Sequence, residues 1–543
     1  MSDIPATVAQ AFRATAARLP NNPFLSITNE TAAAYAIEPI TTTYGEALEA
    51  IEGLVARYRD AGCGRGHRVG LLLENRPAFF FHSIALNSLG TSVVPINADL
   101  RAAELEYLIG HSEMVAALTI EDRAGDLEAA AGRAGRRIPI VLASATSFPA
   151  IPIPTTSTGT PDAQTECALL YTSGTTGKPK GCVLSNDYFV LAGRWYNSIG
   201  GLCAISDGTD RLITPLPMVH MNAMAYSTMA MIMSGGCIVP LDRFHPRTWW
   251  QSVRQSGATI VHYLGVMPSM LLGAEPSADD CRHSVRFGFG AGVDRRDHAA
   301  FEQRFGFPLL EAWAMTETGA GAVVIANREP RHIGSNCFGR PEAAVSVRIV
   351  DEAGRDQPSG TPGELLVRAT GADPHRGFFV EYLKDLEATR DAWVGGYFHT
   401  GDIVRADDDG YLYFVDRRKN VIRRSGENIS AVEVESVLRR HPAVAEVAVA
   451  PVPDPIRGDE VLACVVARDA SPEAELHALA ESIVAFCLEN LAYYKAPGYV
   501  AFLDAVPLTA TSKIQRGELQ RLARELPGQA NCIDTRALKR RRT

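Results

Sequence analysis

The stretch CALLYTSGTTGKPKG, residues 167–181, joins an apolar run to a loop rich in glycine, hydroxyl side chains and lysine. The apolar run CALL predicts a buried strand, and the loop begins where this strand ends. Such a loop exposes backbone N–H groups to an anion, while hydroxyls and lysines add donors and positive charge. The spacing excludes a Walker A loop, because Gly174 and Gly177 enclose only two residues and Pro179 follows Lys178. We therefore expect a phosphate-binding loop of another type.

Strand-like and helical patterns alternate on both sides of this loop. Residues 43–62 have the apolar spacing of an amphipathic helix, and an apolar run, a helical pattern and a second apolar run follow as HRVGLLLEN, AFFFHSIALNSLG and TSVVPIN. Further apolar runs are IPIVLAS, RLITPLP, GCIVPLD, ATIVHYLG and VRFGFGAG. This alternation predicts an α/β fold in which helices cover mainly parallel sheets.

The length of 543 residues exceeds what one hydrophobic core usually supports. From about residue 345 the strands become shorter, with Gly and Asp turns between them, and after DRRKN the pattern is that of a compact α+β unit. We expect a large N-terminal domain at 1–417, which includes a small β-rich subdomain at 345–417, and a small C-terminal domain at 418–543. The basic end RALKRRRT predicts a frayed, solvated terminus.

Composition limits the kinds of partner. The formal net charge of −9 argues against a general nucleic-acid binder, and the partner is expected to be a small molecule. The ten cysteines are scattered without a C-x-x-C pair, which argues against structural zinc. No window reaches the roughly 18 apolar residues of a membrane span, and no leader peptide is evident. We expect a reduced, cytoplasmic protein, and a homodimer is left open.

Four further motifs follow the loop at 171–181 in a fixed order. They are EAWAMTETG at 311–319, YFHTGD at 397–402, DRRKNVIRRSGENISAVEVE at 416–435 and PLTATSKIQR at 507–516. Together with GELLVRA at 363–369 they resemble the adenylate-forming superfamily, which contains acyl-CoA synthetases, non-ribosomal-peptide adenylation domains and firefly luciferase. The nearest similarity is to CoA ligases of the crotonobetaine/carnitine type and of small aryl acids.

This resemblance implies an ATP-dependent carboxylic acid–CoA ligase that uses ATP, Mg²⁺ and coenzyme A. The acid would attack the α-phosphorus of ATP and release pyrophosphate, and CoA would then displace AMP from the acyl-adenylate. Such a reaction needs positive charge, because two anions approach each other. By resemblance, Lys513 bridges the carboxylate and the α-phosphate, although Ser512 precedes it where the family commonly has Gly, a residue with more conformational freedom.

The resemblance also assigns the contacts with ATP. Thr316 would contact the α-phosphate, Glu317 would bind Mg²⁺, and Trp313 would lie against the adenine. Asp402 would accept hydrogen bonds from the ribose hydroxyls, as an acceptor-only carboxylate can, and Arg417 would add a ribose or phosphate contact. The β- and γ-phosphates would lie under Ser173, Thr175, Thr176 and Lys180. The glycine-rich loop bordering the adenine and the acid would present the backbone of Gly290, Ala291 and Gly292.

The second half reaction is assigned to the C-terminal domain, which in the family swings about a hinge residue matched here by Lys419. Gly426 would line the pantetheine tunnel, where any side chain would obstruct the ligand. Arg423 and Arg424 suit the CoA phosphates, and Lys495 in YYKAP is similar to a family segment that flanks the CoA nucleotide.

The expected pocket for the acid is mixed and rich in sulfur, which suits a small-to-medium acyl or aryl chain. Its wall would comprise His220, Met221, Ala223, Met224 and the segment HYLGVMPSM at 262–270, which contains Gly265. The identity of the acid stays open.

Two other functions remain as alternatives. A stand-alone adenylation enzyme would load an acid onto the pantetheine of a carrier protein. His220 lies where amino-acid-activating domains commonly have an acidic residue, which favours an acid other than an amino acid. The second alternative is a non-catalytic regulator that binds a nucleotide and has the fold of the family without its activity. The intact motif residues argue against this reading.

Overall fold

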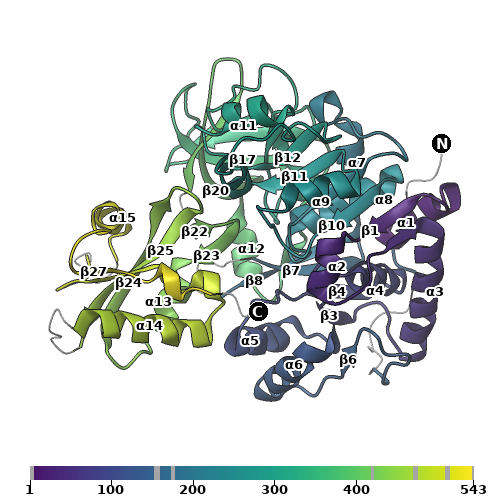
Figure 1. The fold of residues 1–543 in the computed structure, drawn as a ribbon, viewed down its shortest axis with the longest axis horizontal. Coiled ribbons are helices and arrows are strands. Elements are labelled where there is room, and N and C mark those ends of the chain that lie inside the picture. The colour runs from purple at the N-terminus through teal and green to yellow at the C-terminus, as the bar shows by residue number, and fades with distance from the viewer. Residues whose placement is uncertain are drawn as a thin grey trace. The chain divides into compact units, whose positions relative to one another are not determined.

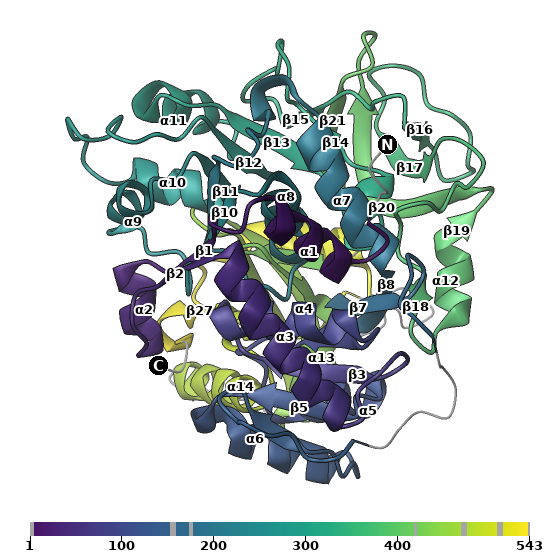
Figure 2. The same cartoon turned by 90° about the vertical axis from the view of Figure 1, so that its right-hand side faces the viewer.

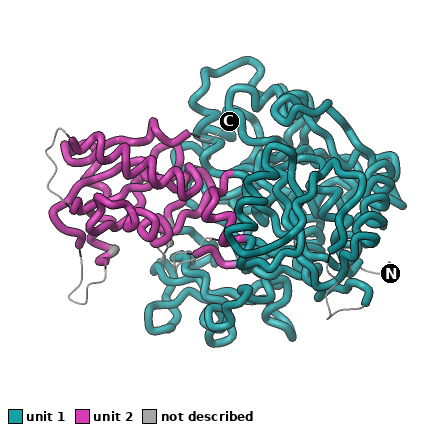
Figure 3. Tube along the Cα trace, turned by 90° about the horizontal axis from the view of Figure 1, so that it is seen from below, with its two compact units in different colours: residues 1–98, 109–171, 181–416 teal, residues 99–108, 172–180, 417–543 magenta. Residues whose placement is uncertain are grey.

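Two units make up the chain in the computed structural model, which describes residues 5–151, 159–172, 178–417, 421–468, 475–507 and 514–540. The first unit contains Met1–Ala98, Ile109–Tyr171 and Gly181–Asp416 (Figure 3). The second unit contains Asp99–Leu108, Thr172–Lys180 and Arg417–Thr543. We call them unit 1 and unit 2.

An eight-stranded sheet carries the segments that were predicted to surround the adenine and the acid. Its strand order is β14-β13-β12-β11-β9-β10-β1-β2, and the pairs from β13 to β1 are parallel while both edge pairs are antiparallel. The strands are β1 (Pro23–Ser26), β2 (Thr41–Thr43), β9 (Arg211–Thr214), β10 (Cys237–Pro240), β11 (Ile260–Leu264), β12 (Phe287–Ala291), β13 (Leu309–Trp313) and β14 (Val324–Ile325). The prediction of a mainly parallel sheet is confirmed here.

A seven-stranded sheet, in the order β18-β8-β7-β4-β3-β5-β6, holds the strands on both sides of the glycine- and lysine-rich loop. The strands are β3 (Arg68–Leu72), β4 (Ser92–Pro95), β5 (Ala116–Thr119), β6 (Ile140–Leu142), β7 (Glu166–Thr172), β8 (Lys180–Ser185) and β18 (Glu381–Tyr382). Neighbouring strands from β7 through β4, β3 and β5 to β6 pair in parallel. At the other edge, β18 pairs antiparallel to β8.

The helices before residue 417 alternate with these strands along the chain. They are α1 (Val8–Arg18), α2 (Asn29–Tyr35), α3 (Tyr44–Asp60), α4 (Pro77–Ser88), α5 (Ala102–Ser112), α6 (Glu121–Arg133), α7 (Asn186–Ser198), α8 (Thr228–Ser234), α9 (Trp249–Ser256), α10 (Val266–Leu272), α11 (His298–Phe305) and α12 (Leu386–Ala392). α1 packs on α3, α4 and α8, as Figures 1 and 2 show. A π-helix at Asn222–Ser227 leads directly into α8.

Local sequence explains where these helices begin. Thr43 and Glu46 form a capping box at the start of α3, in which each side chain accepts a hydrogen bond from the backbone of the other. Ile51, Leu54 and Tyr58 of this helix are buried at the spacing of one face. The helix predicted for residues 43–62 is confirmed.

The β-rich subdomain is an antiparallel sheet in the order β15-β21-β20-β17-β16, with β19 paired to β20. The strands are β15 (Cys337–Gly339), β16 (Val345–Val350), β17 (Gly363–Ala369), β19 (Trp393–Val394), β20 (Tyr397–Ala406) and β21 (Leu412–Arg417). β20 carries the motif YFHTGD.

Unit 2 has its own sheet and its own core. The sheet order is β23-β22-β25-β26-β27, with β24 paired to β25. The strands are β22 (Val421–Arg424), β23 (Glu427–Ser430), β24 (Val444–Asp454), β25 (Gly458–Ala467), β26 (Tyr499–Phe502) and β27 (Cys532–Asp534), and the helices are α13 (Ala431–Leu438), α14 (Leu476–Asn490) and α15 (Arg516–Glu525). Ile422, Val461 and Ile483 are fully buried in this core. The expectation of an α+β C-terminal part is confirmed.

Candidate active site

Four predicted site residues converge where β11 and β12 end. The two strands pair in parallel, with Tyr263 opposite Gly290. A Cβ atom on Gly290 would overlap the carbonyl oxygen of Tyr263, and a Cβ atom on Gly265 would overlap that of Gly292. Gly292 also has a φ of +79°, in the left-handed region that favours glycine. The four residues brought together are Gly265, Gly290, Ala291 and Gly292. We call residues 290–293 the glycine loop.

Glu311 of β13, to which no role was assigned from its motif, holds this loop from the other side. Its Oε2 accepts a hydrogen bond from the backbone N–H of Gly292 at 2.8 Å, and its Oε1 accepts from that of Val293 at 3.2 Å. The hydroxyl of Tyr263 donates to Oε1 at 2.9 Å. Glu311 is buried, and its carboxylate fixes the backbone of the glycine loop at Gly292 and Val293.

Trp313 and Asp402, the residues predicted to contact adenine and ribose, touch each other. The indole Nε1 of Trp313, at the end of β13, donates to Oδ2 of Asp402 on β20 at 2.9 Å. Both side chains are buried, with exposed fractions of 7% and 2%. The structure therefore brings two motifs that lie 89 residues apart in the chain to one place.

Three tyrosines hold the segment that contains Thr316 and Glu317. The Tyr188 hydroxyl on α7 donates to the carbonyl of Thr316 at 2.9 Å, and the Tyr382 hydroxyl on β18 donates to Oε1 of Glu317 at 2.9 Å. The Tyr226 hydroxyl on the π-helix donates to the carbonyl of Gly319 at 3.1 Å. Burial, followed by the charge of Glu317, raises the pKa of Tyr382 and keeps its proton in place as a donor.

The chemistry of Glu317 suits a magnesium ion. A carboxylate oxygen is a hard ligand, and Mg²⁺ in nucleotide enzymes is commonly held by one or two carboxylates together with substrate phosphates. Glu317 is buried in a segment whose backbone carbonyls accept hydrogen bonds from Tyr188 and Tyr226. Tyr382 donates to the Glu317 carboxylate itself.

The end of the glycine- and lysine-rich loop is anchored within unit 2. The Tyr107 hydroxyl on α5 donates to the carbonyl of Pro179 at 2.9 Å, and Lys178 Nζ lies 5.3 Å from the centroid of the Tyr107 ring. Lys180 begins β8 and is partly buried. The predicted phosphate contacts Ser173, Thr175 and Thr176 lie outside the described residues.

The predicted wall of the acid pocket lies at the start of the π-helix. His220 is half-buried, Met221 and Met224 are buried, and Ala223 is fully buried. The backbone N–H of Met224 donates to the carbonyl of His220 at 3.1 Å, which closes a helical turn before the π-helix. Gly265, the fifth predicted member, follows the end of β11 and lies beside the glycine loop.

A buried histidine supports the π-helix from β11. His262 Nδ1 lies 2.7 Å from Oδ1 of Asn222 and 2.8 Å from Oγ of Ser227, and its Nε2 lies 3.0 Å from the hydroxyl of Tyr196. Because an amide oxygen only accepts, Nδ1 carries the proton and Nε2 accepts from Tyr196. Burial lowers the pKa of His262 to about 3, so the ring is neutral at pH 7. Phe289 stacks on it with centroids 4.8 Å apart.

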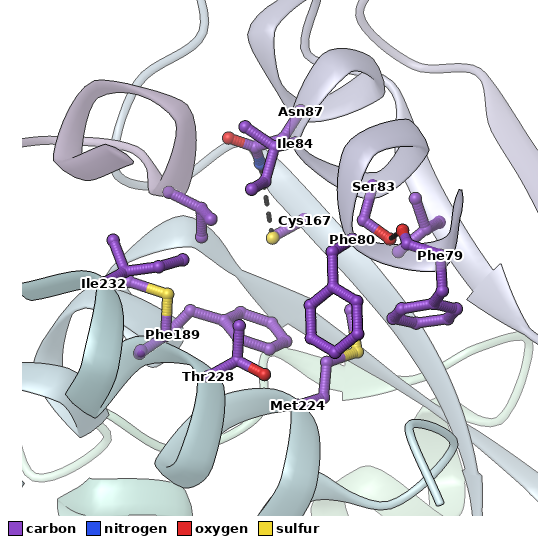
Figure 4. A pocket seen from close by; sticks show the side chains of 13 residues that line it. Phe79, Phe80, Ser83, Ile84, Asn87, Cys167, Phe189, Met224, Thr228 and Ile232 are labelled. Carbon is purple, nitrogen blue, oxygen red and sulfur yellow. Dashed lines mark hydrogen bonds between the residues drawn. The ribbon is translucent and has the colours of Figure 1, made fainter. Parts of the chain in front are cut away.

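Met224 also lines a cavity of about 30 Å³ between α4, α7 and α8 (Figure 4). Phe79 and Phe80 lie on one side of this cavity, with Phe189 and Ile232 on the other. Its lining is almost wholly apolar. His220, Met221, Ala223 and Gly265 do not line it.

In unit 2, Gly426 lies in the tight turn of a hairpin. β22 and β23 pair with Arg424 opposite Glu427, so Ser425 and Gly426 form a two-residue turn. Their φ angles are +50° and +90°, as a type I′ turn requires. Arg423, before this turn, is partly buried, and its backbone N–H donates to Oδ2 of Asp459 at 3.0 Å.

Arg424 is engaged inside unit 2. Its Nε donates to both carboxylate oxygens of Glu460, at 2.9 and 2.8 Å, and both residues are buried. Lys539 Nζ donates to the same carboxylate and to the carbonyl of Tyr494. Burial and then the charge of Arg424 lower the pKa of Lys539 to about 7. The prediction of a frayed basic terminus is wrong for Lys539, because a carboxylate 79 residues earlier captures its ammonium group.

Lys495 is buried in a second cluster of charges in unit 2. Its Nζ donates to Glu104 Oε1 at 2.6 Å and to Glu433 Oε1 at 2.8 Å. Burial acts to lower the pKa of Lys495, but the two carboxylates outweigh it and raise the pKa. The ammonium group is therefore charged and its charge is matched within this unit.

The remaining predicted residues lie at or beyond the ends of described segments. Arg417 ends β21. Lys419, Ser512 and Lys513 lie outside the described residues.

Two supporting residues, Glu311 and Tyr382, were given no role from the sequence, and His262 was expected only as part of the pocket wall at 262–270. Each lies in or beside an apolar strand, which is a weak signal for a buried polar group that needs partners. Their partners come from other strands and helices, so only the fold identifies them.

Comparison with known proteins identifies a family that this chain matches. A model of the AMP-binding enzyme family matches residues 12–373, and a model of the AMP-binding enzyme C-terminal domain matches residues 433–513. The sulfoacetate–CoA ligase of Cupriavidus necator is 32% identical over 527 residues, which cover 94% of this chain and 97% of the relative. The crotonobetaine/carnitine–CoA ligase of Proteus mirabilis is 30% identical over 503 residues, which cover 88% and 93%.

Solved structures show the same fold. A malonyl-CoA ligase in a ternary product complex with methylmalonyl-CoA and AMP has a TM-score of 0.72 and 26% identity, covering 90% of this chain and 97% of that one. The amide bond synthetase McbA of Marinactinospora thermotolerans has a TM-score of 0.79 at 22% identity, covering 94% and 99%. In the part of the chain that the structure describes, no helix is long and apolar enough to cross a membrane.

Proposed function

The chain belongs to the AMP-binding enzyme family, and from this membership we infer that it is an AMP-forming acyl-CoA ligase. The relatives named CoA ligases are similar over nearly the whole chain and both family models match it, which supports CoA as the acceptor. The contact between Trp313 and Asp402 is the geometric observation that carries the nucleotide part of the inference.

In the first half reaction, a carboxylate oxygen of the acid attacks the α-phosphorus of ATP and the bond to pyrophosphate breaks. We propose that Trp313 lies against the adenine and that Asp402 accepts from the ribose hydroxyls. A carboxylate has about four acceptor positions, so Asp402 can hold the indole and the ribose together. Arg417 is proposed as a further ribose or phosphate contact.

Charge on the phosphates is offset from several sides. Thr316 is proposed to donate to the α-phosphate, and Glu317 is the proposed Mg²⁺ ligand. Bound Mg²⁺ would neutralise phosphate charge as the pyrophosphate leaves. Ser173, Thr175, Thr176 and Lys180 are proposed to hold the β- and γ-phosphates, and Lys513 to bridge the two reacting anions.

In the second half reaction, the thiol of CoA attacks the carbonyl carbon of the acyl-adenylate and AMP leaves with the bridging oxygen. We propose Lys419 as the hinge and Gly426 as the backbone beside the pantetheine chain. Arg423 remains the proposed contact for CoA phosphate. Arg424 and Lys495 have their charges matched by buried carboxylates, so we assign both to the stability of unit 2.

We propose a small-to-medium carboxylic acid as the substrate, in a pocket bounded by His220, Met221, Ala223, Met224 and Gly265. We also propose a reducing, cytoplasmic location, because the ten cysteines are all free thiols and nine are buried.

A screen of pyrophosphate release over a panel of carboxylic acids, with and without CoA, tests the function. We expect a subset of acids to release pyrophosphate with ATP and to consume CoA when it is present. Pyrophosphate release that never consumes CoA would favour the carrier-protein alternative. If no acid in the panel caused pyrophosphate release, the result would contradict the ligase assignment.

A further inference from the structure

The side-chain carboxylate of Glu311 holds the glycine loop. Glu311 is 8% exposed, and its carboxylate faces three donors: the backbone N–H groups of Gly292 and Val293 and the hydroxyl of Tyr263. Two successive backbone N–H groups that point at one anion form a nest. Here the anion is supplied by β13 and not by a ligand.

The geometry requires a carboxylate. An ionised carboxylate only accepts hydrogen bonds, and its two oxygens satisfy all three donors here. A glutamine at position 311 has the same shape but replaces one oxygen by an amino group. That group would face an N–H or a hydroxyl and leave a buried donor without its partner.

The contact acts on the part of the chain that is proposed to border both substrates. Gly290 pairs with Glu311 across the β12–β13 register, and the loop that follows packs against Gly265 at the end of β11. Trp313, the proposed adenine contact, lies two residues after Glu311 on the same strand. A shift of the carboxylate therefore moves the loop relative to the adenine and acid sites.

We propose that Glu311 is a positioning residue, which sets the glycine loop in the conformation that binds ATP and the acid. This inference rests on the proposed ligase function. It predicts a change in substrate binding and in the selectivity among acids, whereas a merely structural role lowers only the fraction of folded enzyme.

The test compares Glu311→Gln with Tyr263→Phe in acid-dependent ATP–pyrophosphate exchange. We expect Glu311→Gln to lower kcat/KM by about 100-fold, as misplacement of reacting groups by about 1 Å can do, with KM for ATP raised and the ratio between two acids changed. Tyr263→Phe removes one donor and keeps both backbone bonds, so its constants should stay close to those of the parent. A fall in kcat alone, with unchanged KM and unchanged selectivity, would overturn the proposal.

Two measurements separate this inference from the ligase function. If the parent catalyses no exchange with any acid, the function fails, and calorimetry of ATP binding then decides the inference: weaker binding by Glu311→Gln supports it and equal binding overturns it. If Glu311→Gln does not fold, hydrogen exchange on the parent decides it. Slow exchange of the Gly292 and Val293 amides is expected, and exchange as fast as in an unstructured peptide would overturn the contact.

Discussion

The hydrogen bond from Trp313 to Asp402 orients a carboxylate that is proposed to hold the ribose. Trp313→Phe keeps an aromatic ring for the adenine but removes the Nε1 donor. A hydrogen bond to a charged group contributes about 1.5–3 kcal/mol, so we expect KM for ATP to rise by about 10-fold.

The measurement is initial-rate kinetics with ATP varied at saturating acid. Trp393→Phe is the matched control, because Trp393 lies in the same unit and packs against Phe378 and Phe398 instead. Equal changes of KM in both variants would refute a specific role for the indole nitrogen.

His262 makes the stability of unit 1 depend on pH. Its folded pKa of about 3 lies below the ordinary value of 6.5, because the ring is buried. Below pH 6.5 the unfolded chain takes up a proton on this histidine that the folded chain does not. The contribution of His262 to the free energy of unfolding is therefore present at neutral pH and is lost as the pH falls towards 3. Between these two pKa values the free energy of unfolding falls by about 1.4 kcal/mol for each unit by which the pH is lowered.

We therefore expect the parent to lose about 2 kcal/mol more free energy of unfolding than His262→Gln between pH 6.5 and pH 5. Urea unfolding at the two pH values measures this difference. His375→Gln, at an exposed histidine, should keep the pH dependence of the parent. A His262 variant with the slope of the parent would show that the buried ring does not remain neutral.

At the level of single residues, the sequence identified the motif side chains but not the groups that orient them. Trp313 and Asp402 were predicted from their motifs, yet their contact depends on how β13 and β20 meet. Glu311 opens the same motif as Trp313, but its role was not evident because its partners lie in the glycine loop. Tyr382 lies outside the quoted motifs, and its partner is Glu317. Buried hydrogen-bond partners are set by tertiary packing, which local patterns do not encode.

At the level of elements, the cavity between α4, α7 and α8 lies beside the π-helix and is lined by its Met224. Ile232 is fully buried and lines this cavity. Ile232→Ala would enlarge it, and we expect a loss of about 2–5 kcal/mol in the free energy of unfolding. Ile40, which is 48% exposed, provides the matched control. Urea unfolding should give a small change for Ile40→Ala, and equal changes for the two variants would contradict the packing seen at Ile232.

The strands and helices were the most predictable part of the fold. The apolar runs that became β3, β7, β11 and β12 are continuous and short, as buried parallel strands are. The π-helix at Asn222–Ser227 was not expected, because its Asn222 and Ser227 side chains are held by His262 on a strand that follows later in the chain. The burial of Lys539 was also not predicted, because its partner Glu460 lies 79 residues earlier in the chain.

At the level of the whole molecule, the two half reactions can be separated by a change in the β22–β23 hairpin of unit 2. Gly426 has a φ of +90°, so Gly426→Leu places a branched side chain on a strained backbone beside the proposed pantetheine path. We expect ATP–pyrophosphate exchange close to that of the parent and CoA thioester production lowered by about 100-fold.

Gly528→Leu is the matched control, because Gly528 also lies in unit 2, has a φ of +93° and would place a Cβ atom in open space, with nothing within 4 Å. It should leave both half reactions unchanged. Loss of both activities in Gly426→Leu, or of neither, would contradict the placement of the thiol path at this turn.

The fate of the carboxyl oxygens reports the two-step reaction most directly. An acid that supports turnover would be labelled with ¹⁸O in both carboxyl oxygens and incubated with the enzyme, ATP and CoA, and the products would be analysed by mass spectrometry. Attack of the carboxylate on the α-phosphorus makes one labelled oxygen the bridge of the acyl-adenylate. When the thiol attacks the carbonyl carbon, AMP departs with this oxygen and the thioester keeps the other. We expect AMP with a single labelled oxygen, formed in the same amount as the thioester. Unlabelled AMP, or ADP in place of AMP, would contradict an acyl-adenylate intermediate.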